Sequence, residues 1–180
     1  MMIRTATMAD LPAIAQLGAV CFPAAEAATE ASFARRLEAY PNHFWVLMNG
    51  ETIVSFVNGL VTNEPDLQDE MYDNAALHDE NGAWQMIFGV DTIPVYRCQG
   101  CAERLLRHVI REARTQGRNG LVLTCKEPLL HYYGKFGFVN EGISQSTHGD
   151  VRWYQMRLTF QCSTADCARC AGCSQSTDHS

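Results

Sequence analysis

The stretch Tyr96-Arg97-Cys98-Gln99-Gly100-Cys101-Ala102 decides the fold of this chain. It follows a strand-like run, Trp84–Val90, and opens an amphipathic segment, Cys101–Gln116. The first amides of a helix have no partner within the helix, and the aligned peptide dipoles place partial positive charge there. Gly100 also removes a side chain where an anion would approach the backbone. The order of strand, tight turn and helix therefore predicts a binding site for a phosphate group.

Two other phosphate motifs do not fit the residues around Gly100. No Lys-Ser or Lys-Thr pair follows, as a P-loop requires, and the three glycines of the dinucleotide-binding fingerprint are missing. The stretch matches the pattern Arg/Gln-x-x-Gly-x-Gly/Ala, and it resembles the pyrophosphate loop of the GNAT acetyltransferases. An ordinary strand-to-helix turn is the alternative. The resemblance implies that acetyl-CoA is bound by Arg97, Cys98, Gln99, Gly100, Cys101, Ala102 and Glu103.

Composition limits the class of protein. A chain of 180 residues with 47% apolar residues fits one domain with a sizeable core. No apolar run reaches membrane-spanning length, and polar residues interrupt the start, which argues against a signal peptide. A net charge of −6, from 20 acidic and 14 basic residues, argues against a nucleic-acid partner. We expect a cytoplasmic protein whose eight cysteines are largely reduced.

Hydrophobic periodicity predicts an α/β protein, more narrowly of the α+β kind. Asn49-Gly50 is a hairpin signal between two of the expected strands. The order of elements predicts the GNAT fold, a mixed and mostly antiparallel sheet of about six to seven strands flanked by about four helices. Helices are expected around Leu11–Leu17 and over Thr29–Tyr40, Cys101–Gln116 and Pro128–Lys135, and strands over Phe44–Met48, Thr52–Leu60, Trp84–Val90, Leu121–Cys125, Phe138–Glu141 and Val151–Phe160.

The resemblance covers the chain from Ile3 to about Phe160. We therefore expect residues 1–160 to form the acetyltransferase domain and residues 161–180 to form a separate tail. A narrower resemblance is to the arylalkylamine (serotonin-type) branch of the family, in a bacterial-like short form. It rests on Leu77-His78 and on the segment Thr124–Phe136, whose Tyr133-Gly134-Lys135-Phe136 is similar to the Tyr-x-Arg/Lys-Phe pattern of that branch.

The resemblance implies roles in acetyl transfer for several residues. Tyr133 would protonate the departing thiolate of coenzyme A, because a phenol of pKa about 10 can donate to a thiolate of pKa about 8.5. The alternative is that Tyr133 only packs. Val90 would hold the oxyanion through its backbone N–H, and Asp91 and Thr92 would line the pantetheine arm of acetyl-CoA through backbone atoms.

The base is where this sequence departs from the vertebrate members of that branch. Their two histidines align with Met86 and Phe88, neither of which accepts a proton. Glu26 stands where insect-type members place a glutamate that acts through water, and burial beside apolar residues would raise its pKa and improve it as a base. His148 and His131 are the alternatives, because histidine titrates near neutral pH. Structural roles are open for all three.

Substrate recognition is predicted from charge and from apolar side chains. The segment Glu64–Glu80 holds seven acidic residues and no Lys or Arg. It either attracts a protonated amine or simply keeps a loop solvated. Phe22, Met86, Phe88 and Trp153 either line a pocket for an aryl or alkyl group or belong to the core.

The tail changes character, with many Ser, Thr and Ala residues. Four cysteines, Cys162, Cys167, Cys170 and Cys173, could hold a soft metal such as zinc through thiolates. The composition favours a flexible, redox-reactive tail, so no metal site is predicted.

These observations predict an acetyl-CoA-dependent N-acetyltransferase that acts on a small-molecule amine, of arylalkylamine type, by direct transfer in a ternary complex. Polyamines or protein amino groups are alternative acceptors. The rival class is a coenzyme A-binding regulatory or metal-responsive module with little turnover. An acetyl-cysteine intermediate is disfavoured because no thiol is accompanied by its own base. The sequence does not predict the oligomeric state.

Overall fold

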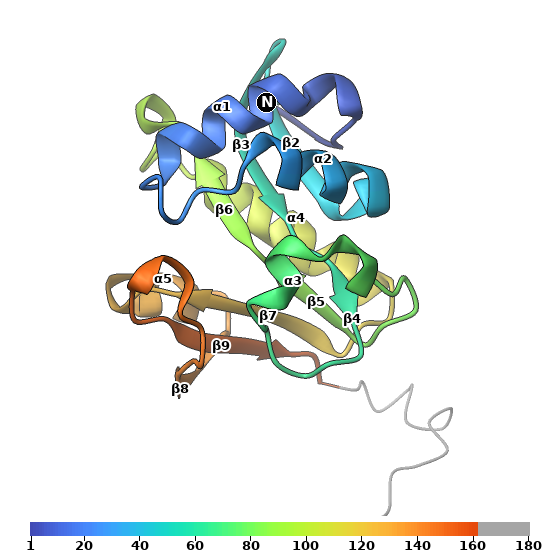
Figure 1. Ribbon diagram of the computed structural model, residues 1–180, viewed down its shortest axis with the longest axis vertical. Coiled ribbons are helices and arrows are strands. Elements are labelled where there is room, and N and C mark those ends of the chain that lie inside the picture. Colours follow the sequence, from blue (N-terminus) through green and yellow to red (C-terminus); the bar gives the residue numbers. More distant parts are fainter. Residues whose placement is uncertain (162–180) are drawn as a thin grey trace, which may run out of the picture.

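The computed structural model describes residues 1–161, which form two β-sheets with helices packed against them (Figure 1). Neighbouring strands are antiparallel throughout, except for one parallel pair, β5 and β7. The first sheet has the order β1 (Met2–Thr5), β2 (Phe44–Asn49), β3 (Thr52–Asn58), β6 (Gly89–Thr92), and the second has the order β4 (Val61–Thr62), β5 (Trp84–Ile87), β7 (Gly120–Cys125), β9 (Tyr154–Thr159), β8 (Val139–Ile143).

Within residues 1–161, five α-helices accompany the sheets: α1 (Leu11–Cys21), α2 (Glu30–Ala39), α3 (Glu70–Asp73), α4 (Cys101–Thr115) and α5 (Leu130–Gly134). The residues of β2 alternate between two cores. Phe44 and Val46 pack with side chains of α1 and α2, whereas Trp45 and Leu47 pack with side chains of α4. This alternation follows from the two-residue period of a strand, and it places α1 and α2 on one face of the first sheet and α4 on the other.

Local signals in the sequence account for where these helices begin. Ahead of α1, the Thr7 N–H donates to Asp10 Oδ2 at 2.8 Å, as in a capping box. Thr29 Oγ1 accepts the Ser32 N–H at 3.1 Å and caps α2. Gly100 precedes α4 with a φ of 78°, a left-handed conformation that glycine adopts without a Cβ clash.

The predicted fold class is confirmed, but the sheet differs from the prediction in two ways. Residues 1–161 contain nine strands in two sheets rather than six to seven in one. The run Trp84–Val90, expected as one strand, breaks at Phe88, so that β5 pairs with β7 while β6 pairs with β3. The two sheets therefore separate between β6 and β7, which are not paired with each other.

The remaining differences concern short elements. The sequence did not indicate β1, the two-residue strand β4, or α3, which lies within the acidic segment. None of the helices within residues 1–161 combines the length and the apolar character that crossing a bilayer requires. The predicted cysteine tail, with Cys162, Cys167, Cys170 and Cys173, lies outside the described residues.

Candidate active site

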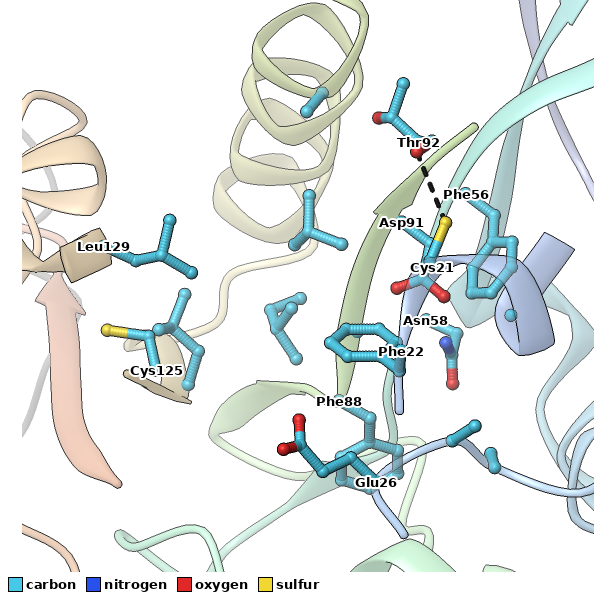
Figure 2. Close-up of a pocket in the computed structure, with 18 of the residues that line it drawn as sticks. Cys21, Phe22, Glu26, Phe56, Asn58, Phe88, Asp91, Thr92, Cys125 and Leu129 are labelled. Carbon is cyan, nitrogen blue, oxygen red and sulfur yellow. Dashed lines mark hydrogen bonds between the residues drawn. The ribbon is translucent and has the colours of Figure 1, made fainter. Parts of the chain in front are cut away.

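A cavity of about 760 Å³ lies where the two sheets separate. Its wall combines the connection between α1 and α2, strand β6, the start of α4, the end of β7 and helix α5 (Figure 2). All but one of the predicted site residues line it: Glu26, Val90, Asp91, Thr92, Arg97, Cys98, Gly100, Cys101, Ala102, Glu103, Tyr133 and His148. The exception is Gln99, whose side-chain amide donates to the carbonyl of Val95 at 2.7 Å instead.

The start of α4, where the sequence predicts phosphate binding, lies at the cavity. Gly100 lines the cavity, and a Cβ atom placed on it would meet no atom within 4 Å. The nearby carboxylate of Glu103 is neutralised, because Lys135 Nζ contacts it at 2.7 Å and Arg107 Nε at 3.0 Å. An anion approaching the first-turn amides of α4 thus meets cations and backbone N–H groups.

Tyr133, on α5, lies in the wall and is 8% exposed. Burial raises the pKa of its phenol above the ordinary value, with smaller contributions from Tyr132, Cys125 and Asp91. The ring also packs edge-on against Tyr132 and Phe138. The phenol of Tyr133 therefore stays protonated and its ring is held by aromatic packing, so its role as proton donor remains a prediction beside the packing that the structure shows.

The thiols of the wall are poor nucleophiles. Burial raises the pKa of Cys125 to about 11, and its Sγ contacts Met156 Sδ at 3.6 Å. Burial, followed by the charge of Asp91, raises the pKa of Cys21. Because the thiolate is the reactive form, neither residue is suited to carry the acetyl group.

Glu26 and His148, far apart in sequence, lie together. The imidazole Nε2 of His148 is 2.9 Å from the main-chain oxygen of Glu26. Glu26 Oε1 accepts from Lys126 Nζ at 2.8 Å, whereas Oε2 is buried without a partner. A Cβ on Gly149 would lie 2.6 Å from Glu26 Cγ, so glycine is required for this contact. His131, the other predicted alternative, is exposed and lies away from the cavity.

Three polar residues of the wall were missed by sequence reasoning. Arg36 donates from one guanidinium nitrogen to Asn58 Oδ1 and from the other to the carbonyl of Tyr72, both at 2.9 Å. The side chain of Asp91 is buried beside them, although only its backbone was expected to contribute. Burial raises the pKa of Asp91 to about 8, against the lowering effect of Arg36 and Arg97. The signal that could have identified it was an acidic residue directly after the apolar run that ends at Val90.

The predicted apolar pocket is present in part. Phe22, Phe88 and Trp153 line the cavity, whereas Met86 is buried in the core. The acidic segment Glu64–Glu80 contributes only Tyr72 and Asp73 to the wall. Several of its carboxylates have partners, since Asp66 pairs with Arg157 at 2.7 Å and Asp69 accepts from Ser146 and Thr147. These contacts favour a structural role for most of the segment.

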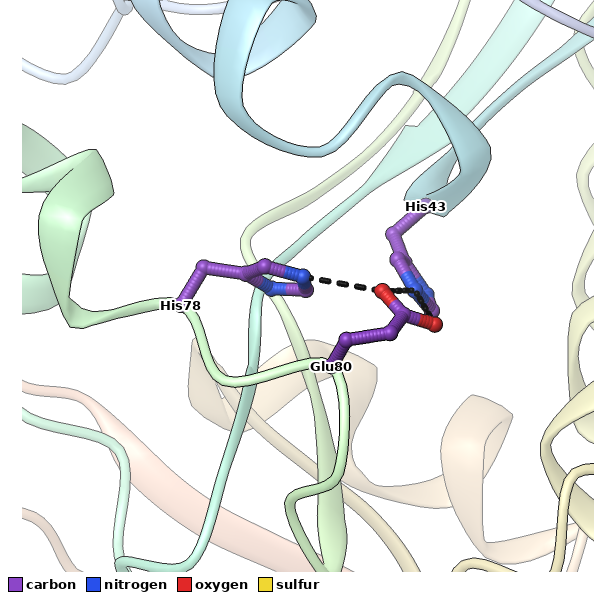
Figure 3. Close-up of side chains that lie close together, drawn as sticks. All are labelled: His43, His78 and Glu80. Carbon is purple, nitrogen blue, oxygen red and sulfur yellow. Dashed lines mark hydrogen bonds and ion pairs between the residues drawn. The ribbon is translucent and has the colours of Figure 1, made fainter.

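One further cluster of residue types that bind metals lies outside the cavity (Figure 3). Glu80 Oε2 is 2.9 Å from His43 Nε2 and 3.0 Å from His78 Nε2. His78 Nδ1 accepts the N–H of Val61 at 3.1 Å, so in neutral His78 the proton is on Nε2. That nitrogen donates to Glu80 and has no lone pair for a metal, so the geometry fits a hydrogen-bonded cluster.

Three solved structures illustrate what this chain is similar to. The GphF GNAT-like decarboxylase in complex with isobutyryl-CoA is 23% identical, with a TM-score of 0.75 over 88% of this chain and 99% of that chain. The loading GNATL domain of CurA from Lyngbya majuscula is 17% identical, with a TM-score of 0.77 over 88% and 96%. The ribosomal-protein-S18-alanine N-acetyltransferase from Escherichia coli is 19% identical, with a TM-score of 0.67 over 90% and 95%. At these identities the likeness establishes the fold.

A family assignment comes from the sequence itself. No curated protein sequence matches the chain. The family model described as "Acetyltransferase (GNAT) family" matches residues 11–138, which include α1, α4 and the cavity-lining residues of α5. The predicted acyltransferase class and acetyl-CoA as co-substrate are thereby confirmed, whereas the arylalkylamine branch has no support from these comparisons. The chain belongs to the GNAT family of acetyltransferases.

Proposed function

We propose that the protein transfers the acetyl group of acetyl-CoA directly to the primary amine of a small, arylalkylamine-like molecule. One observation carries this proposal: a single cavity joins the start of α4, the phenol of Tyr133 and an apolar wall that also contains buried carboxylates. The cavity thus offers an anion-binding end for the co-substrate, a proton donor, and a place for an apolar cation.

In this proposal the diphosphate of acetyl-CoA binds the first-turn amides of α4, with Arg97 and Lys135 beside it. The backbone N–H of Val90 holds the thioester oxygen as it becomes negative, and the pantetheine arm passes Asp91 and Thr92 between the separated sheets. The unpaired edge of β6 that faces the gap supports this placement, because backbone groups there are not used by a neighbouring strand.

Tyr133 is the proposed proton donor to the thiolate of coenzyme A. Its buried phenol stays neutral over the working pH range, since burial raises its pKa. Direct attack by the amine is favoured over an acetyl-cysteine intermediate, because the pKa values of Cys21 and Cys125 are both raised.

The base belongs on the acceptor side of the cavity. Of the two residues that the sequence proposes, Glu26 has a buried and unpartnered oxygen, while His148 uses Nε2 in its contact with the Glu26 carbonyl. Glu26 therefore remains the sequence-based candidate, with His148 second. Glu26 Oε1 accepts from Lys126 Nζ at 2.8 Å, so this carboxylate already has a cationic partner.

The class of acceptor follows from the wall near Glu26. Phe22, Phe88 and Trp153 offer apolar surface for an aryl or alkyl group. Protein amino groups are the second candidate, because one structurally similar enzyme is the ribosomal-protein-S18-alanine N-acetyltransferase from Escherichia coli. A coenzyme A-binding module with little turnover is the alternative to an enzyme.

The cytoplasmic location and the boundaries of the domain, residues 1–160, remain predictions.

Release of free thiol from acetyl-CoA tests the proposal. The purified protein should turn over with tryptamine-like and phenethyl amines faster than with linear polyamines or with a peptide that has a free amino terminus. If only the peptide is acetylated, the acceptor is a protein amino group and not a small amine. Tight binding of acetyl-CoA in calorimetry without turnover on any amine would support the regulatory module.

A further inference from the structure

Unsatisfied polar atoms gather at one place in the described part of the chain. Five buried side-chain nitrogen or oxygen atoms lack a hydrogen-bond partner, and four of them belong to residues of the cavity wall. Such atoms are rare in folded proteins, because a buried polar atom that is left unpaired has lost its hydrogen bonds to water without replacement. The four atoms are Glu26 Oε2, Arg36 Nε, Asn58 Nδ2 and Asp91 Oδ1.

Asp91 and Asn58 border the same small space. Gly89 has no side chain, and the position that its Cβ would occupy is 3.0 Å from Asp91 Oδ1 and 3.7 Å from Asn58 Nδ2. Figure 2 shows both side chains near Phe22, on the side of the cavity opposite Cys125. A nitrogen atom of a ligand above Gly89 would be within hydrogen-bond reach of Asp91, so the space is suited to a primary amine.

We propose that Asp91, rather than Glu26, binds the acceptor amine and takes its proton, with Asn58 and Arg36 as positioning residues. The inference rests on the proposed function and names the base of that reaction. Asp91 would recognise the amine itself through Oδ1, while Asn58 is held in place by the hydrogen bond from Arg36 to its Oδ1. Phe22 and Phe88 would contact the apolar group attached to the amine.

The proton transfers of this step balance. One N–H bond of the ammonium breaks and an O–H bond forms on Asp91. The freed lone pair attacks the thioester carbon, so a C–N bond forms and the C–S bond breaks. The thiolate receives a proton from Tyr133, and the second proton lost by the nitrogen as the amide forms restores the phenol.

Burial favours this role for Asp91, against the effect of the two nearby arginines. Arg36 faces it from α2, Arg97 from the turn before α4, Cys21 from α1 and Tyr133 from α5. No ion pair forms with Asp91 among residues 1–161, whereas Glu26 is paired with Lys126 at 2.8 Å. Burial outweighs the two arginines and brings the pKa of Asp91 to about 8. A carboxylate of that basicity accepts an amine proton more readily than one with a pKa of about 4.

Matched variants separate the two carboxylates. The rate kcat/KM for the acceptor should be measured from pH 6 to 10 at saturating acetyl-CoA, with two amines of different pKa. In the wild type we expect kcat/KM to rise with pH through an apparent pKa near 8, which gives the pH profile a limb there. This limb should lie at the same pH for both amines, because it reports a group of the protein. Asp91→Asn should lower kcat/KM by about 100-fold or more and remove this limb, and Glu26→Gln should keep it.

The opposite result, loss of the limb in Glu26→Gln and retention in Asp91→Asn, would overturn the inference and establish Glu26 as the base. Unchanged affinity of Asp91→Asn for acetyl-CoA in calorimetry would show that the cavity is intact. Gly89→Ala fills the space beside Asp91 Oδ1, so it should raise the KM for the acceptor at least tenfold and leave acetyl-CoA binding unchanged. An unaltered KM would contradict the binding site. If the wild type acetylates no amine at all, the proposed function fails first.

A measurement of stability tests the protonation of Asp91 without any substrate. Folding raises its pKa from 3.8 to about 8, so between these pH values the folded protein holds a proton that the unfolded chain has released. The contribution of Asp91 to the free energy of unfolding is therefore complete below about pH 4 and is lost as the pH rises to about 8. Asp91→Asn lacks this dependence, so its Tm relative to wild type should rise between pH 5 and 8. A constant difference in Tm would contradict a buried carboxyl that titrates near 8.

Discussion

Tyr133 shows how packing and chemistry meet in one residue. The same burial that fixes its ring against Tyr132 and Phe138 raises the pKa of its phenol and keeps the proton available. We expect Tyr133→Phe to lower kcat by about 100-fold or more while the Kd for acetyl-CoA stays the same, because only the proton donor is lost. Thiol release and calorimetry measure the two quantities.

The adjacent tyrosine is the matched control. Tyr132 also lines the cavity and packs against the ring of Tyr133, but Tyr132 is only half-buried. Tyr132→Phe should keep kcat within a few-fold of the wild type. Equal losses in the two variants would assign Tyr133 to packing and not to proton transfer.

Residue identities in this site were predictable where a motif fixes them and not where burial does. Tyr133 and the turn around Gly100 occupy the predicted places in the cavity. The sequence also selected Glu26 and His148, which the fold brings into contact. It did not select the side chain of Asp91, since its pKa depends on α1, α2 and β3 closing over it, and those elements are distant in sequence.

At the scale of elements, the two ends of α4 allow a controlled experiment. Gly100 precedes the helix with a φ of 78° and Gly117 follows it with a φ of 77°, and a Cβ on either would meet nothing within 4 Å. Alanine at either position is strained, so Gly100→Ala and Gly117→Ala should each cost about 1 kcal/mol of stability.

The two variants should differ in affinity for acetyl-CoA. Gly100 lines the cavity and Gly117 does not, so a methyl group at Gly100 stands between the first-turn amides and the diphosphate. Calorimetry should show at least tenfold weaker binding of acetyl-CoA to Gly100→Ala and unchanged binding to Gly117→Ala. Equal affinities would remove the start of α4 from the binding site.

The break at Phe88, which divides β5 from β6, was not predicted from the sequence. The mostly apolar run predicts one strand, and Gly89 is the local sign of a break that the prediction did not use. The break arises because β3 pairs with Gly89–Thr92 while β7 pairs with Trp84–Ile87. Which strand each half of the run pairs with, β3 or β7, depends on contacts between segments that are distant in sequence. The resulting break opens the cavity.

Across the whole molecule, the cluster in Figure 3 joins segments that are remote in sequence. Glu80 lies between His43, before β2, and His78, and it also contacts Arg118, after α4, at 3.4 Å. Burial opposes its charge, but the hydrogen bond from His43 leads the contributions that lower the pKa of Glu80 overall. The carboxylate is thus a shared partner for three side chains, two of them buried.

Removal of that partner should destabilise the fold. Glu80→Ala leaves the buried His43 and Arg118 short of a hydrogen bond, so we expect the free energy of unfolding to fall by about 1–3 kcal/mol. Denaturant titration measures the change. Glu64→Ala, which removes an exposed carboxylate of the same acidic segment, should leave stability nearly unchanged. An equally small effect of Glu80→Ala would mean that the cluster contributes nothing to the fold.

The sequence by itself determined most of the longer helices and strands, the turn that begins α4, and the family. These features depend on neighbours within a few residues: hydrophobic period, caps, and a glycine that permits φ near 78°. Only the tertiary structure decided which carboxyl lies unpaired in the cavity and how strongly it holds a proton. Arg36 and Asn58 are 22 positions apart, and Asp91 is further along the chain. Their electrostatics come from the water that folding removes, and no local pattern of residues encodes that removal.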